Sequence, residues 1–178
     1  MLVVFINGKS RSGKDTFCRM CDELAYTEFN NAITVDSISL IDKVREAASL
    51  LGYDEQRKTE KDRVFLAELL KLAKDTYNSP INYVASYINS HTNTSLLFVH
   101  ARAKNDIDDI KKILSEYDNV NTVTLKIESQ RKDVLSGSIA DGEVDIIRYD
   151  YCIQNNGTLD LLRYNAKLFL KHVFPGIG

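Results

Sequence analysis

The strongest constraint on the fold lies near the N-terminus, where an apolar run leads into a loop with two glycines. Leu2–Asn7 has the sequence LVVFIN, which predicts a strand covered on both faces. From Lys14 to about Tyr26, apolar residues recur at three- and four-residue intervals, and this spacing predicts an amphipathic helix. The intervening GKSRSG therefore connects a buried strand directly to a helix.

This loop has the spacing G-x-x-x-x-G-K of a phosphate-binding loop. In such loops backbone N–H groups and the N-terminus of the following helix surround the phosphates, and the lysine reaches the β- and γ-phosphate oxygens. Asp15 stands where a Mg²⁺-ligating hydroxyl is usual, and the hydroxyl follows at Thr16. We expect nucleotide binding if Asp15 faces Mg²⁺, a cationic side chain or solvent. The predicted nucleotide-binding residues of the loop are Gly8, Ser10, Arg11, Ser12, Gly13, Lys14, Asp15 and Thr16.

Composition argues against several other functions. The net charge of −2 in 178 residues gives no basic face for nucleic acid, and the sequence contains no apolar run of about 18 residues that could span a membrane. Cys18 and Cys21 form a C-x-x-C inside the predicted helix, but no second ligand pair accompanies them, so we interpret them as ordinary thiols. With no basic leader before the first strand, we expect a cytoplasmic protein.

Strand and helix patterns alternate along the rest of the chain. Further strands are predicted at Ala32–Ser37, Ser95–Ala101, Val120–Ile127 and Tyr149–Gln154. Helices are predicted at about Ile41–Leu51, Glu60–Asp75, Asn82–Asn89 and Asp106–Tyr117, and after the capping residue Thr158. Alternation of this kind predicts a three-layer α/β/α domain with a parallel sheet. The additional helices between the second and third strands form an insertion at about 38–92, which we expect to bind the substrate.

The sequence GKSRSGKDT resembles the loop of P-loop nucleoside monophosphate kinases, and its Gly-Lys-Asp-Thr form is closest to the phage-type deoxynucleoside monophosphate kinases. Gly-Lys-Asp also resembles the animal-type phosphomevalonate kinases. The resemblance implies a five-stranded parallel sheet of order 2-3-1-4-5, with ATP as donor and Mg²⁺ as cofactor. It also implies an acceptor domain after the second strand and a lid before the last strand, here at about 130–146. The expected reaction is phosphoryl transfer from ATP to a (deoxy)nucleoside monophosphate.

The same resemblance assigns roles to individual residues. Arg102 follows the third strand, where the usual acidic residue is missing and His100 and Ala101 stand nearby. Arg131 precedes SGSIADGEVD (Ser136–Asp145), which we expect to be an exposed loop. The implied catalytic residues are Lys14, Arg102 and Arg131, the implied Mg²⁺ ligands are Asp15 and Thr16, and the turn against adenine is Asn155 with Gly157.

Three residues of the second strand and the insertion are candidates for binding the acceptor: Asp36, Arg45 and Arg63. The arginines suit an acceptor phosphate, and Arg63 is preferred because an apolar helical face follows it. A solvated helix face is the alternative for both arginines, and helix capping is the alternative for Asp36.

Two other functions stay open at this point. One is a P-loop kinase for another small phosphorylated metabolite, similar to phosphomevalonate or dephospho-coenzyme A. The other is a nucleotide-binding protein or slow ATPase, which the missing acidic residue near Arg102 favours. His100 itself has two interpretations, a packed strand histidine or a proton acceptor, and its apolar strand neighbours favour the first.

Overall fold

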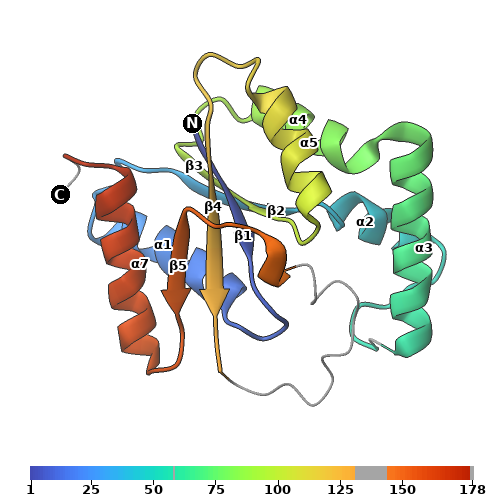
Figure 1. The fold of residues 1–178 in the computed structure, drawn as a ribbon, viewed down its shortest axis with the longest axis horizontal. Coiled ribbons are helices and arrows are strands. Elements are labelled where there is room, and N and C mark those ends of the chain that lie inside the picture. The colour runs from blue at the N-terminus through green and yellow to red at the C-terminus, as the bar shows by residue number, and fades with distance from the viewer. Residues whose placement is uncertain (58, 131–143, 177–178) are drawn as a thin grey trace. The chain divides into compact units, whose positions relative to one another are not determined.

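A computed structural model describes residues 1–57, 59–130 and 144–176, and Figure 1 shows their helices and strands. The chain divides into two compact units. One, the core unit, combines Met1–Ile38 with Thr92–Gly178. The other, the inserted unit, is Ser39–His91. No helix of the described ranges is both long and apolar enough to cross a membrane.

The sheet is five-stranded and parallel, and its order is β2-β3-β1-β4-β5. Its strands are β1 (Leu2–Asn7), β2 (Val35–Ser39), β3 (Leu96–His100), β4 (Asn121–Glu128) and β5 (Tyr151–Gln154). In the centre of the sheet, Ile6 of β1 is paired with His100 of β3 on one side and with Leu125 of β4 on the other. The predicted fold class and strand order are therefore confirmed.

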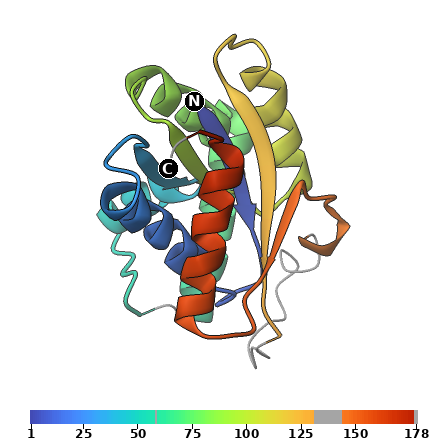
Figure 2. The same ribbon diagram turned by 90° about the vertical axis from the view of Figure 1, so that its left-hand side faces the viewer.

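Helices cover both faces of the sheet in the core unit. On one face lie α1 (Lys14–Thr27) and α7 (Leu159–Val173), and on the other lies α5 (Lys104–Leu114) (Figure 2). The ring of Phe17 in α1 is fully buried and meets the rings of Phe98 and Phe169 edge-on, at 6.2 and 5.7 Å between centroids. Burial of one such side chain contributes about 1.5–3 kcal/mol. This packing fixes the start of α1 against the end of β1.

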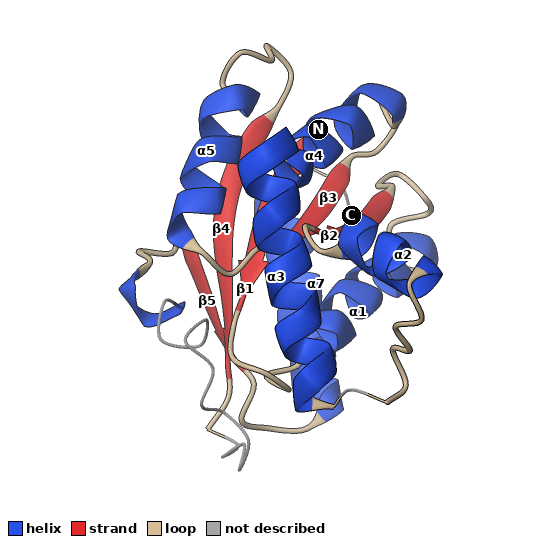
Figure 3. Ribbon diagram, turned by 90° about the vertical axis from the view of Figure 1, so that its right-hand side faces the viewer, coloured by secondary structure: helices blue, strands red, loops and turns tan. Residues whose placement is uncertain are grey.

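The inserted unit consists of three helices, α2 (Asp42–Leu50), α3 (Glu60–Tyr77) and α4 (Ser79–Ser90), drawn in blue in Figure 3. Thr59 and Asp62 form a reciprocal capping box at the start of α3, so the local sequence sets that boundary. A small cluster of buried side chains, Val44, Ala48 and Leu66, lies between α2 and α3.

Several predicted boundaries shift by a few residues in the structure, and two of these shifts follow from local geometry. The second strand begins at Val35 rather than Ala32, because the N–H of Ala32 donates to the carbonyl oxygen of Phe29 in a turn (2.8 Å). The helix predicted to follow Pro80 already begins at Ser79. Proline has no N–H, but the first turn of a helix needs none, so Pro80 lies inside that turn.

The prediction of an exposed loop at Ser136–Asp145 is wrong at the C-terminal end of that segment. Val144–Ile146 forms a 3₁₀ turn, η1, and the Val144 side chain is fully buried. The phenolic O–H of Tyr149 also donates to the Val144 carbonyl oxygen (3.1 Å). Residues 131–143 lie outside the described ranges. The buried Val144 therefore packs within the core unit just before β5.

Candidate functional site

The segment between β1 and α1, residues 8–13, is called here the glycine loop. Gly8 has a φ of 148°, and a Cβ atom there would lie 2.3 Å from the carbonyl oxygen of Ile127. Gly13 has a φ of 98°, and its Cβ would lie 2.4 Å from Nδ2 of Asn155. Both approaches are too short for any side chain, and both φ values disfavour residues other than glycine. The path of the loop therefore requires glycine at these two positions.

Two buried asparagines hold the glycine loop from either side. Asn7 accepts a hydrogen bond from the N–H of Gly8 (2.8 Å) and donates one to the Arg102 carbonyl oxygen (3.2 Å). Asn155 donates from Nδ2 to the Ser12 carbonyl oxygen (2.9 Å). Asn7 was not among the predicted residues, although a polar residue that ends an apolar strand directly before a glycine is a usable signal. Asn155 was predicted to lie near adenine, but its hydrogen bond to the loop, which joins residues 143 positions apart, was not predicted.

Lysine and backbone groups of the loop converge as an anion site requires. Nζ of Lys14 donates to the carbonyl oxygens of Gly8 (2.8 Å) and Lys9 (3.1 Å). The Ser12 hydroxyl is buried and has no hydrogen-bond partner among the described residues. Because α1 starts without a side-chain cap, its first N–H groups point toward the loop unsatisfied by any capping side chain. The arrangement fits a nucleotide phosphate bound at a helix N-terminus.

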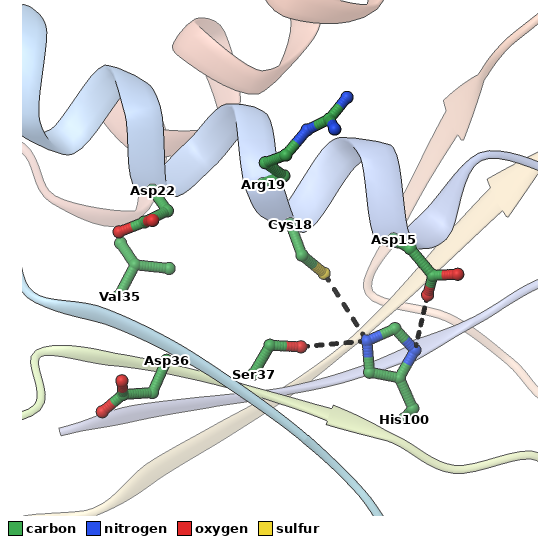
Figure 4. A pocket seen from close by; sticks show the side chains of 8 residues that line it. All are labelled: Asp15, Cys18, Arg19, Asp22, Val35, Asp36, Ser37 and His100. Atoms are coloured by element: carbon green, nitrogen blue, oxygen red, sulfur yellow. Dashed lines mark hydrogen bonds and ion pairs between the residues drawn. The ribbon is translucent and has the colours of Figure 1, made fainter.

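Asp15 faces solvent and an imidazole ring. Its side chain is 94% exposed, and its Oδ1 lies 3.6 Å from Nδ1 of His100 (Figure 4). The sequence requires Asp15 to face Mg²⁺, a cationic side chain or solvent, and the exposure of its side chain to solvent meets that condition.

Mg²⁺ fits this site only if the nucleotide supplies most of its ligands. The described ranges contain no group of three His, Cys, Asp or Glu side chains that could hold a metal. Mg²⁺ at phosphate-transfer sites needs just one or two protein ligands besides phosphates and water. Thr16, in the first turn of α1, and Asp15 remain the predicted ligands.

A cavity of about 310 Å³ lies beside α1 within the core unit (Figure 4). Its lining residues are Asp15, Cys18, Arg19, Asp22, Val35, Asp36, Ser37 and His100. Nε2 of His100 lies 3.0 Å from Oγ of Ser37 and 3.8 Å from Sγ of Cys18. Burial raises the pKa of Cys18 to about 12, so this thiol stays protonated and neutral. His100, at the end of β3, therefore bridges α1 and β2.

Asp36 and Ser37 reach the cavity from β2. The carboxylate of Asp36 accepts a hydrogen bond from the Thr94 hydroxyl, and the next helix, α2, has Ile41 as its N-cap, with no capping hydrogen bond from a side chain. Helix capping by Asp36, the alternative interpretation, is therefore not what the structure shows. Ser37 was not among the predicted residues, because nothing in ITVDSIS distinguishes it from Ser39.

A chain of ion pairs joins the glycine loop to β4. Asp145 lies 3.2 Å from Lys9 and 2.9 Å from Lys126, and Lys126 lies 3.1 Å from Glu128. The hydrogen bond from Lys126 is the main cause that holds the pKa of Asp145 below its usual range. The Lys126 side chain is only 15% exposed. η1 is thereby tied to the glycine loop, a link that sequence patterns did not indicate.

The other predicted residues of the core unit lie around the same loop. Arg102 is exposed and lies two residues after the end of β3, and Arg131 falls outside the described residues. Ser10 and Arg11 are exposed on the glycine loop. Gly157 lies in the turn before α7, whose first residues are capped by the Thr158 hydroxyl, as predicted.

The two predicted arginines of the inserted unit have carboxylate neighbours within that unit. Arg45 lies 3.5 Å from Asp42 and 3.8 Å from Glu55. Arg63 lies 3.4 Å from Glu60, and its side chain is 55% exposed. Pairs this exposed are weak and exchange easily with a ligand. Binding of an acceptor phosphate by Arg45 and Arg63 stays a prediction.

No protein-family model matches the chain, and no curated protein sequence matches it either. Two solved structures of the APS kinase of Mycobacterium tuberculosis are similar to it in fold. One, of a cysteine-to-alanine mutant, has a TM-score of 0.51 at 12% identity, and the alignment covers 95% of this chain and 96% of that one. The other, in complex with AMPPNP and APS, has a TM-score of 0.53 at 13% identity and the same coverage. At these identities the likeness establishes a shared fold.

Proposed function

We propose that the protein is an ATP-dependent phosphotransferase with a small-molecule acceptor. The observation that carries this proposal is the glycine loop, a close-packed turn between a buried strand and an uncapped helix, with the Lys14 ammonium against its backbone. Such a loop binds the β- and γ-phosphates of a nucleoside triphosphate. The shared fold with an APS kinase whose structure contains AMPPNP supports it.

In this proposal the residues of the core unit position the donor and neutralise its charge. The amides of the glycine loop and of the first turn of α1 bind phosphate oxygens, and Lys14 contacts the γ-phosphate that is transferred. Mg²⁺, when bound at Thr16, neutralises charge on the phosphates. Arg102 and Arg131 are proposed to contact the acceptor and the transferred group. Asn155 and Gly157 are proposed to border the adenine.

A (deoxy)nucleoside monophosphate is the first acceptor class to test, because the Gly-Lys-Asp-Thr loop resembles that of the corresponding kinases. Arg45 and Arg63 would hold its phosphate through charge-assisted hydrogen bonds, and Asp36 would contact its uncharged part. A second candidate function, nucleotide binding with slow ATP hydrolysis, is favoured by the end of β3, where His100 stands rather than an acidic residue.

A coupled assay of ADP release tests the proposal. It uses MgATP with a panel of nucleoside and deoxynucleoside monophosphates, on wild type, Lys14→Ala and the control Lys112→Ala, which changes an exposed lysine of α5. We expect at least one acceptor to raise ADP release in the wild type and in Lys112→Ala, but not in Lys14→Ala. Acceptor-independent release alone would support the slow ATPase instead.

A further inference from the structure

The outward face of α7 is apolar, although the sheet needs only the inward face of this helix. The inward face consists of four buried side chains, Leu162, Ala166, Phe169 and Leu170. On the opposite side, Leu161, Tyr164 and Leu168 follow one another at the three- and four-residue spacing of a single helical face. A helix that only covers a sheet has polar residues at these positions. α7 therefore has two apolar faces, and the sheet uses one of them.

The three outward residues, called here the α7 face, are open to solvent. Leu161 is 48% exposed, Tyr164 is 56% exposed and Leu168 is 47% exposed. In Figure 2, α7 is drawn in red in front of the sheet, and no other element of the core unit is drawn over it. Isolated exposed leucines are common on protein surfaces, but neighbouring apolar residues on one exposed face mark interaction sites. The α7 face therefore suits contact with another molecule.

Charges of opposite sign border the α7 face at its two ends. Asp160 lies in the first turn of the helix and Lys171 in the last turn, and both are exposed. About three helical turns separate them, so they lie on the same edge of the face. Arg163 and Lys167 of the same helix pair with glutamates of α1. Asp160 and Lys171 form no ion pair with any residue that the structure describes.

This pattern is complementary to itself when a second copy of α7 lies antiparallel to the first. In such a two-fold pair, Leu161 of each copy faces Leu168 of the other, and Asp160 of each copy lies beside Lys171 of the other. The midpoints of these two pairs lie within one residue of each other in the sequence, next to Tyr164. The two Tyr164 rings then meet at the two-fold axis. Every other contact is made twice, as a two-fold interface requires.

We infer that the α7 face is the interface of a homodimer in which two α7 helices pack antiparallel. The charges select this orientation, because a parallel pair would bring Asp160 against Asp160 and Lys171 against Lys171. A partner of another kind would not account for this self-complementarity. The inference does not rest on the proposed phosphotransferase function, because no residue of the α7 face belongs to the glycine loop.

The small size of the α7 face predicts a weak dimer. The helix has 15 residues and is about 22 Å long, so one of its faces buries less than the roughly 800 Å² per partner of a standard interface. We expect the full chain to be a monomer at about 1 µM and mostly a dimer at about 500 µM. Sedimentation velocity across this range measures the dissociation constant of the dimer. A wild type that stays monomeric throughout would overturn the inference.

Tyr164→Glu locates the interface. This variant places two carboxylates opposite each other at the two-fold axis, so the dissociation constant should rise about tenfold or more. The matched control is Tyr77→Glu, which changes an exposed tyrosine of α3 and should leave the dissociation constant unchanged. Far-UV circular dichroism checks that both variants are folded. Wild-type association in Tyr164→Glu would show that another surface forms the dimer, and the inference would be wrong.

Mixing two charge variants tests the antiparallel arrangement. Asp160→Lys and Lys171→Glu, each alone, should raise the dissociation constant about fivefold, because like charges then meet at both ends of the pair. In an equimolar mixture the heterodimer again pairs opposite charges at both ends, so its affinity should return to the wild-type level. The helix dipole also favours Asp160 in the first turn and Lys171 in the last, but mixing two chains does not restore an effect within one chain. A mixture that associates no better than the single variants would overturn the antiparallel pairing.

Discussion

The glycine loop and the inserted unit hold their charged and polar groups in opposite ways. The loop is fixed by the buried side chains of Asn7 and Asn155, whereas Arg45 and Arg63 of the inserted unit are held by partly exposed ion pairs. Removing one partner of a buried hydrogen bond costs about 1–3 kcal/mol, and exposed ion pairs contribute about 0–1 kcal/mol. The glycine loop is therefore held by buried hydrogen bonds, whereas Arg45 and Arg63 are held by weak ion pairs whose partners a ligand can replace.

The largest expected effect comes from Lys14→Ala. Loss of the ammonium should lower kcat by about a hundred- to a thousandfold, because Lys14 is the residue proposed to contact the γ-phosphate that is transferred. Steady-state ADP release measures this, with Lys112→Ala as the control. A loss below about tenfold would show that the loop does not organise the reaction.

Gly13→Ala tests, through the free energy of unfolding, how tightly the glycine loop is packed compared with the inserted unit. Its Cβ would lie 2.4 Å from Asn155, whereas Gly52 of the inserted unit has a similar φ of 90° and nothing within 4 Å of its Cβ. Gly52→Ala should therefore cost only backbone strain, about 1 kcal/mol, and Gly13→Ala about 2–4 kcal/mol. Urea unfolding at equilibrium compares the two. Equal losses of unfolding free energy in the two variants would mean that the Asn155 side chain moves away from the new Cβ without loss of stability.

A double-mutant cycle of Asn155→Ala with Gly13→Ala measures the energetic coupling between these two residues. Alone, it leaves the Ser12 carbonyl oxygen without its donor and should cost about 1–3 kcal/mol of stability. In this background the Cβ of Gly13→Ala has room. The double variant should therefore lose less unfolding free energy than the sum of the losses of the two single variants. Additive costs in urea unfolding would show that the two residues do not meet.

Arg63→Ala tests the inserted unit. We expect KM for a nucleoside monophosphate acceptor to rise about tenfold and stability to change by less than about 0.5 kcal/mol, because Arg63 is exposed and its pair with Glu60 is weak. The control is Arg163→Ala on α7, which removes an ion pair with Glu23 of 3.0 Å and should leave KM unchanged. If KM for ATP rises as much as KM for the acceptor, Arg63 does not act on the acceptor.

The smallest effect concerns acid stability. Burial tends to raise the pKa of Asp150, but hydrogen bonds from the N–H and hydroxyl of Thr124 outweigh it and lower the pKa overall. A lowered folded-state pKa contributes stability above the unfolded value near 4, and this contribution is lost as the pH falls through the folded value. Asp150→Asn should therefore cost a few tenths of a kcal/mol at about pH 7 and less at about pH 3. A destabilisation by Asp150→Asn that grows as the pH falls would contradict a lowered pKa of Asp150 in the folded state.

Sequence patterns predicted the parts of this molecule that depend on neighbouring residues. LVVFIN followed by two glycines and a lysine defined β1, the glycine loop and the start of α1, and Thr158 defined the start of α7. The strand order came from the resemblance to nucleoside monophosphate kinases. Boundaries moved where a turn at Phe29 or a proline in a first helical turn overrode the simple pattern.

Contacts between distant segments could not be predicted from the sequence. Asp15, Ser37 and His100 come from α1, β2 and β3, and nothing local to any of them indicates the other two. The bond from Asn155 to the glycine loop and the pairing of Lys9 with Asp145 likewise depend on tertiary packing. The sequence therefore predicted the glycine loop of the candidate site, but not the contacts from distant segments that hold it in place.

Direct titration of AMPPNP with Mg²⁺ into the protein tests the central claim most directly, because it requires no acceptor. Isothermal titration calorimetry should show one saturable site in the wild type and in Lys112→Ala. Lys14→Ala should weaken that binding by about a hundredfold or more. Absence of binding in the wild type, or equal affinity in Lys14→Ala, would contradict a triphosphate bound by the glycine loop.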